Sequence, residues 1–201
     1  MKIPAHSRDR GFTLVELLVV ITIIAVLAGA GFSAGMAAIQ KARRTTALAT
    51  ATAIETAVNN FFTEYGSMPS EATTDETVNT KKGDANGVKL VNVLLGLEGE
   101  SGTPLNTRAV KFLSAREGKA DRNGLIYSAT GSSVEGLYDP WGGGFNVILD
   151  CDYDEKVLPA PKGGAAPTNP LNGRRVAVWS DGADGVTAAG KAADDVKTWG
   201  Q

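Results

Sequence analysis

Apolar residues divide the chain into a short polar start, a long apolar run and a mixed remainder. The stretch Phe12–Phe32 is apolar apart from Glu16 and two threonines. About 20 apolar residues at roughly 1.5 Å each span the hydrocarbon core of a bilayer. The pattern therefore predicts a membrane helix over residues 12–36. A cleaved secretory signal peptide that ends at the small residues 28–31 is the alternative interpretation.

After this run the apolar residues narrow to one stripe, and no helix breaker intervenes before Gly66 and Pro69. The stripe recurs every three or four positions and consists of Leu48, Ala51, Ile54, Val58, Phe61 and Tyr65. That spacing predicts an amphipathic continuation of the same helix over residues 37–66. The whole helix is then about 50 residues, or roughly 75 Å, long.

The remaining residues, 67–201, read as a globular α+β domain. Residues 67–87 are polar and contain glycine, which favours an irregular loop. Two short helices are expected, at Val88–Leu97 and Arg108–Ala115. Three strands follow in the pattern of β-branched and aromatic residues, at Leu125–Ala129, Phe145–Asp150 and Val176–Ser180. The predicted architecture is one long helix packed on a small antiparallel sheet.

Composition excludes several classes of function. The net charge is −2 and the longest basic group is Lys41, Arg43 and Arg44, so nucleic acid is not an expected partner. A single cysteine, Cys151, rules out an intrachain disulfide. The only histidine, His6, precedes the globular part, and no nucleophile elbow or phosphate-binding loop is present. We therefore expect that the protein is not an enzyme.

The charged residues at the start carry a family resemblance. Inserting the Glu16 carboxylate near the start of a membrane helix costs free energy, so we expect this side chain to have a partner. The string Arg-Asp-Arg-Gly11, followed by Phe12-Thr-Leu-Val-Glu16 and a long aliphatic run, resembles the leader of type IV pilins and pseudopilins. The resemblance implies that residues 1–11 are a leader peptide. A prepilin peptidase would cut between Gly11 and Phe12 and methylate the new N-terminus, and Glu16 would pair with the free amine of a neighbouring subunit.

Three later strings resemble the major pseudopilin of type II secretion (the general secretion pathway protein G family). They lie at 60–69, 139–142 and 179–185, whereas 70–136 reads as a longer insert. The resemblance implies a structural subunit of a secretion pseudopilus, polymerised from the inner membrane to drive protein export. Its expected partners are copies of itself, an inner-membrane assembly platform and minor pseudopilins. The C-terminal domain would lie in the periplasm, on a single-pass anchor, and the filament in the periplasm or at the cell surface.

Two other functions remain open at this point. One is a type IV pilin for adhesion, motility or DNA uptake. Many pilins of that kind carry a C-terminal disulfide, which one cysteine cannot form. The other is a membrane-anchored calcium-binding domain that never polymerises. Cleavage of the N-terminus distinguishes them, because both filament functions require it and the anchored calcium-binding domain does not.

Acidic residues gather in two places. Asp181, Asp184, Asp194 and Asp195 follow the last predicted strand in a glycine-rich stretch. Such a loop offers the oxygen ligands that calcium requires, and a solvated acidic terminus is the plain alternative. The pseudopilin resemblance implies one calcium ion, held by the side chains of Asp184, Asp194 and Asp195 and by the backbone carbonyl of Asp181.

The second acidic run, Asp150–Glu155, has the opening spacing of an EF-hand loop. Its sixth position is Glu155 rather than glycine and its twelfth is Pro161, so the EF-hand interpretation fails. We expect a solvated hairpin turn instead. Cys151, which alternates with the acids, is expected to point inward as an inert buried thiol.

Overall fold

The structure is a computed structural model, and it describes residues 12–99, 103–160, 169–185 and 195–200. The chain divides into two compact units, 1–41 and 42–201. A single helix, α1 (Leu14–Tyr65), provides the described part of the first unit and the beginning of the second.

Helix α1 has 52 residues, which confirms the prediction of one long uninterrupted helix. It ends where expected, because Gly66 takes a left-handed φ of +70° and its N–H donates to the Phe62 carbonyl at 2.8 Å. No helix in the described part of the chain reaches the combined length and hydropathy that crossing a membrane requires.

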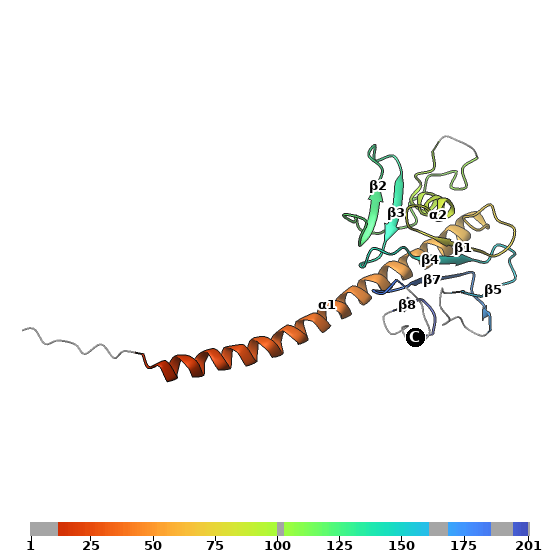
Figure 1. The fold of residues 1–201 in the computed structure, drawn as a ribbon. Helices are drawn as coiled ribbons and strands as arrows, with labels where there is room; N and C mark the ends of the chain where they lie inside the picture. Colours follow the sequence, from red (N-terminus) through yellow and green to blue (C-terminus); the bar gives the residue numbers. More distant parts are fainter. Residues whose placement is uncertain (1–11, 100–102, 161–168, 186–194, 201) are drawn as a thin grey trace, which may run out of the picture. The chain divides into compact units, whose positions relative to one another are not determined.

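The second unit is built on a four-stranded antiparallel sheet with strand order β1-β4-β7-β8. These strands are β1 (Glu76–Asn79), β4 (Asn146–Leu149), β7 (Val176–Ser180) and β8 (Val196–Lys197). Two small two-stranded sheets accompany it, formed by β2 (Gly124–Tyr127) with β3 (Val134–Tyr138) and by β5 (Lys156–Val157) with β6 (Leu171–Asn172). Helix α2 (Ala85–Leu95) follows β1. The predicted α+β class is confirmed (Figure 1).

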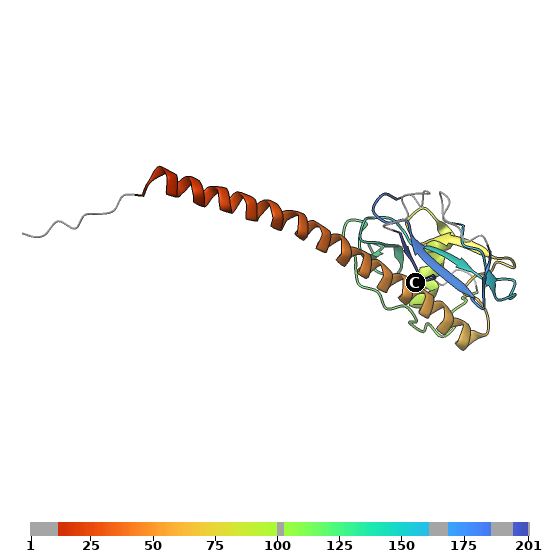
Figure 2. The ribbon, with the colours of Figure 1, turned by 90° about the horizontal axis from the view of Figure 1, so that it is seen from below.

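The core lies between the sheet and the second half of α1 (Figures 1 and 2). The buried helix residues are Ala47, Ala51, Ile54, Ala57, Val58 and Phe61, which confirms the predicted stripe. Side chains alternate between the two faces of each strand, so Val147 and Val178 pack into this core while Ile148 and Trp179 pack into a smaller cluster on the opposite face. Both faces of the central strands are therefore covered.

Four of the predicted elements lie close to observed ones, whereas the second short helix is not formed. Strands β2, β4 and β7 match the expected strands within a few residues, and α2 matches the helix expected at 88–97. The segment Arg108–Ala115 forms no helix. The backbone N–H groups of Phe112 and Leu113 instead donate to the Leu94 carbonyl, both at 2.9 Å, which fixes the segment alongside the end of α2.

A buried asparagine explains why this segment stays non-helical. The Asn106 side chain is 4% exposed, and its amide donates to the carbonyls of Val93 at 2.8 Å and Val110 at 2.7 Å. Its side-chain oxygen accepts from the Tyr65 hydroxyl at 2.7 Å and from the Val110 N–H at 3.0 Å. The two bonds with Val110 occupy backbone groups that a helix would pair internally, and the bonds with Val93 and Tyr65 hold the asparagine against α2 and α1.

The expectation of an irregular loop over 67–87 is also wrong in part, because it contains β1 and the start of α2. Asp84 is responsible for the change of direction. Its carboxylate caps α2 by accepting from the Gly87 N–H at 3.0 Å and also accepts from the Asn79 N–H at 2.9 Å. One aspartate thus ends the strand and starts the helix.

Candidate functional site

The first turn of α1 contains a capping box formed by Thr13 and Glu16. The Glu16 carboxylate accepts from the Thr13 N–H at 2.9 Å and from the Thr13 hydroxyl at 2.7 Å. The Glu16 N–H donates back to the Thr13 hydroxyl oxygen at 3.2 Å. This reciprocal pattern satisfies donors that the start of a helix leaves unpaired. Glu16 therefore has a local partner within one chain, next to the predicted cleavage position.

This capping box was not predicted, although the sequence contains its signal, a threonine followed three residues later by a glutamate before an apolar run. Phe12, the residue expected at the mature N-terminus, is 76% exposed. Gly11, the other residue of the predicted cleavage site, lies outside the described residues. The predicted pairing of Glu16 with a neighbouring subunit stays a prediction.

The first unit exposes a large apolar surface. Its large hydrophobic side chains are between 45% and 79% exposed, a range that belongs to surface residues. They are Phe12, Leu14, Val15, Leu17, Leu18, Val19, Val20, Ile21, Ile23, Ile24, Val26, Leu27, Phe32, Met36 and Ile39. A continuous apolar surface of this extent marks an interaction site with lipid or with another protein.

The predicted calcium residues follow strand β7. Asp181 and Asp184 line the same polar hollow, of about 650 Å³, together with glycines of the neighbouring turn. Asp195 is 5% exposed. Asp194 lies outside the described residues, so the proposed set of four is not seen together. Carboxylates on a glycine-containing loop fit a calcium ion by their chemistry, and the site stays a prediction.

Polar contacts fix the start of this loop. The Ser180 hydroxyl donates to the buried carboxylate of Asp139 at 2.6 Å, and the Gly182 N–H donates to the same hydroxyl at 3.2 Å. The Asn146 amide donates to Asp181 at 3.2 Å. The loop therefore leaves the sheet in a direction set by β4 and by the turn after β3.

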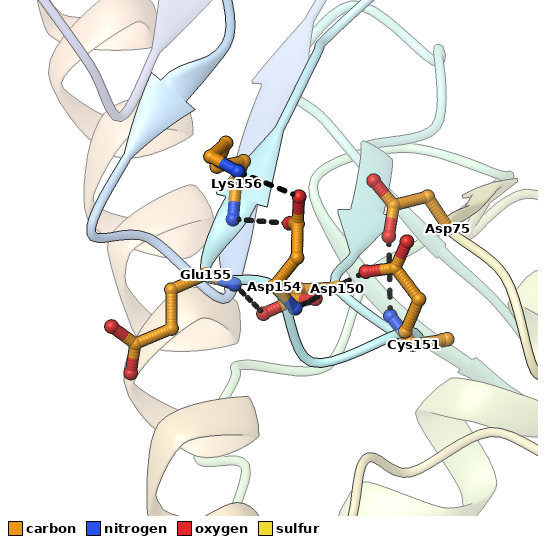
Figure 3. Close-up of polar contacts among 7 residues, drawn as sticks. Asp75, Asp150, Cys151, Asp154, Glu155 and Lys156 are labelled. Atoms are coloured by element: carbon orange, nitrogen blue, oxygen red, sulfur yellow. Dashed lines mark hydrogen bonds and ion pairs between the residues drawn. The ribbon is translucent and has the colours of Figure 1, made fainter.

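The second acidic run lies at the opposite end of the sheet from Asp181, where Asp75 joins it (Figure 3). Asp75, Asp150 and Asp152 place one carboxylate oxygen each within 4.8 Å of the others. Asp75 accepts from the Cys151 N–H at 3.3 Å. Asp150 accepts from the N–H groups of Asp154 at 3.2 Å and Glu155 at 3.1 Å, so its charge is held inside the turn.

These contacts correct the prediction for the second acidic run. The run is a turn, but it joins β4 to β5, which pair with different strands, and so it is not a hairpin. Asp150 is buried, with 0% exposure, whereas Asp152, Asp154 and Glu155 are exposed as expected. Desolvation raises the pKa of the Asp150 carboxyl, and desolvation together with the charge of Asp152 raises the pKa of Asp75. The protonated forms of Asp150 and Asp75 are therefore favoured relative to isolated carboxyl groups.

The prediction of an inert buried thiol is supported. Cys151 is 3% exposed, and burial, together with the charge of Glu76, raises its pKa to about 11. At neutral pH the thiol is protonated and therefore a poor nucleophile.

Comparison with known proteins places the chain in a family. Residues 6–32 match the family model described as "Prokaryotic N-terminal methylation motif". The chain is also 32% identical over 132 residues to "Prepilin peptidase-dependent protein D" of Escherichia coli (strain K12), an alignment that covers 65% of this chain and 70% of that protein. The chain belongs to this pilin-like family. No solved structure gave a significant match.

The family match covers the residues that the leader resemblance singled out. The matched range 6–32 contains Gly11, Phe12 and Glu16 together with the first part of the exposed apolar surface. The resemblance of the sequence to pilins and pseudopilins is therefore confirmed. The long helix followed by antiparallel strands is consistent with a pilin-like fold.

Proposed function

We propose that the protein is a structural subunit of a type II secretion pseudopilus, processed by a prepilin peptidase between Gly11 and Phe12. The observation that carries this proposal is the coincidence of a methylation motif at 6–32 with a helix whose apolar side chains are exposed. A helix of that kind needs a covering surface. In the proposed cycle, lipid covers it before assembly and other copies of the chain cover it afterwards.

Glu16 exchanges partners in this cycle. Before assembly its carboxylate is held by Thr13 in the capping box. Cleavage after Gly11 creates a positive amine on Phe12, and a neighbouring subunit presents such an amine to Glu16 within an apolar environment. An isolated carboxylate there is unfavourable, whereas a close ion pair offsets much of the desolvation. The pairing therefore sets the axial register between subunits.

The variants Glu16→Ala and Thr13→Ala separate pairing from capping. Both lose the capping box, but Thr13→Ala keeps the carboxylate. We expect Glu16→Ala to be processed and to accumulate unassembled, while Thr13→Ala assembles. The measurements are the mass of the mature chain, which reports loss of residues 1–11, and the yield of sheared filaments. Normal filament yield from Glu16→Ala, or equal loss from both variants, contradicts the pairing role.

A deletion strain tests the secretion role against the alternative of a type IV pilus pilin. The pseudopilus proposal predicts that specific exoproteins stay in the periplasm while surface pili persist. Normal secretion with loss of pili or of twitching motility favours the pilus instead. A mature protein that still begins at Met1 contradicts both filament functions and leaves the anchored calcium-binding domain.

We also propose that the loop after β7 binds one calcium ion through Asp184, Asp194 and Asp195, with Asp181 contributing its carbonyl. The bound ion would stabilise a domain that has no disulfide, by about 2.7 kcal/mol at a concentration one hundred times its Kd. Addition of a chelator should lower the melting temperature of wild type but not that of Asp184→Asn. Equal melting curves with and without chelator contradict the site.

A further inference from the structure

A basic hollow lies on the second unit, next to the turn after β3. Its volume is about 390 Å³, and four cationic side chains line it: Arg43 of α1 and Arg116, Lys119 and Arg122 of the segment before β2. All four residues are exposed, and Glu117 is the one acid in the lining. The chain as a whole has a net charge of −2, so this concentration of positive charge is local.

Within the part of the chain that the structure describes, none of the four cations forms an ion pair. Six other lysines and arginines form ion pairs in the described part of the chain, for example Lys82 with Glu135 at 2.7 Å. None of these pairs involves a cation of the hollow. The Arg116 guanidinium donates from Nε to the Asn123 carbonyl at 2.9 Å, which orients its fork without neutralising it. Like charges held together repel one another unless an anion binds.

The turn that carries Arg116, Lys119 and Arg122 is fixed by backbone hydrogen bonds. The Lys119 N–H donates to the Arg122 carbonyl at 3.1 Å, and the Gly118 N–H donates to the Leu125 carbonyl at 2.8 Å. The Asn123 N–H donates to the Asp139 carbonyl at 2.7 Å and ties the turn to the next strand end. The turn is therefore positioned by the sheet framework rather than loosely attached.

The same turn concentrates unusual backbone angles. Ala120, Asp121 and Asn123 have φ values of +53°, +55° and +63°, a region that residues other than glycine rarely occupy. Backbone strain of this kind persists where the surrounding structure over-determines it, often at ligand clamps. The strained backbone of this turn places Lys119 and Arg122 at the same hollow.

We propose that this hollow binds the phosphate of an anionic phospholipid headgroup. Clustered guanidinium and ammonium groups match phosphate oxygens, and each basic side chain near an anionic membrane surface contributes to binding. The choice of a lipid follows from Arg43, which comes four residues after Ile39, where the exposed large hydrophobic side chains of α1 end. This inference rests on the proposed function in one respect, that the first part of α1 lies in lipid before assembly.

The test uses the full chain in detergent, titrated by calorimetry with three probes: dihexanoyl phosphatidylglycerol, dihexanoyl phosphatidylcholine and inorganic phosphate. The test variant is Lys119→Gln/Arg122→Gln. The matched control is Lys81→Gln/Lys111→Gln, which removes two exposed charges outside the hollow. We expect the anionic lipid to bind wild type and control alike, and the test variant about thirtyfold more weakly, about fivefold for each charge removed.

Three outcomes overturn the proposal: no preference for the anionic over the zwitterionic lipid, inorganic phosphate binding as tightly as the anionic lipid, or equal losses in the two double variants. If Lys119→Gln/Arg122→Gln fails to fold, Arg43→Gln tests the same hollow from α1, with an expected loss of about fivefold. The titration needs neither cleavage nor polymerisation. Failure of the pseudopilus proposal, seen in processing and filament yield, is therefore distinguishable from failure of this one.

Discussion

Replacement of Asp139 is the sharpest test of how the second unit holds its loops. This carboxylate is 1% exposed and accepts four hydrogen bonds. One oxygen accepts from the N–H groups of Trp141 at 2.9 Å, Gly142 at 2.8 Å and Gly143 at 2.8 Å. The other accepts from the Ser180 hydroxyl at 2.6 Å. Asp139 thereby joins the turn after β3 to the end of β7.

The expected cost of Asp139→Ala follows from these contacts. Hydrogen bonds to a charged acceptor contribute about 1.5–3 kcal/mol each, and removal of one partner leaves the others unpaired. The three N–H groups belong to half-buried residues and can recruit water, which reduces the loss. We therefore expect the free energy of unfolding to fall by about 3–5 kcal/mol, a large fraction of the 5–15 kcal/mol typical of a domain. The melting temperature should fall by about 10 °C.

Asp139→Asn provides the matched control. Its side-chain oxygen still accepts from the turn, and its amide can donate to the Ser180 oxygen, so the expected cost is about 1–2 kcal/mol. The assay is urea unfolding in detergent with a chelator present, followed by the near-ultraviolet signal of Trp179 and Trp199, whose rings stack edge to face at 5.7 Å. A loss below about 1 kcal/mol for Asp139→Ala refutes the reasoning, as does a loss equal to that of Asp139→Asn.

Three further predictions concern the other end of the sheet and α2. Because the folded-state pKa of Asp75 is raised, Asp75→Asn should increase the melting temperature at pH 7 by about 1–3 °C. The gain should vanish below the unfolded pKa, where Asp75 of the wild type is also neutral. No gain at pH 7 would contradict the destabilisation of charged Asp75 by desolvation and by the charge of Asp152. Cys151 should resist iodoacetamide at pH 8 and react once urea unfolds the chain, whereas equal rates would mean an open thiol. Gly87→Ala should unfold α2 or cost more than about 2 kcal/mol in the same urea assay, since a Cβ there would lie 1.8 Å from the Asn79 carbonyl oxygen, and a neutral effect would contradict that approach.

The sequence predicts those helices and strands for which the hydrophobic periodicity and the neighbouring start or stop residues indicate the same element. The α1 stripe repeats over several turns and ends at Gly66, so periodicity and stop signal coincide. Strand β1 has only four residues, with one buried side chain, which is too short for an alternating pattern to stand out. The segment around Asn106 reads as helical because its competing partners come from α1 and α2, which local periodicity does not include.

The acid group at Asp75, Asp150 and Asp152 shows why sites assembled from distant residues escape sequence analysis. The register of β1 against β4 pairs Glu76 with Leu149, so Asp75 and Asp150, the next residues outward, come to lie beside each other. No local pattern encodes that register, and β1 itself was not predicted. Asp181 and Asp184 are close in sequence, and their shared hollow could be anticipated from the chain alone. Proximity in sequence, more than residue type, decided which acids could be grouped in advance.

Without a disulfide, the C-terminal segment is held to α1 by separate weak contacts. Arg174 donates to Glu55 of α1 at 3.0 Å and to the Thr198 carbonyl at 3.3 Å, and Arg44 of α1 donates to the Asp195 carbonyl at 3.4 Å. A partly exposed ion pair such as Arg174 with Glu55 contributes up to about 1 kcal/mol. Contacts of that size permit local opening well below the global unfolding free energy. A calcium ion bound between β7 and β8 would oppose this opening at the point where the chain enters its last strand.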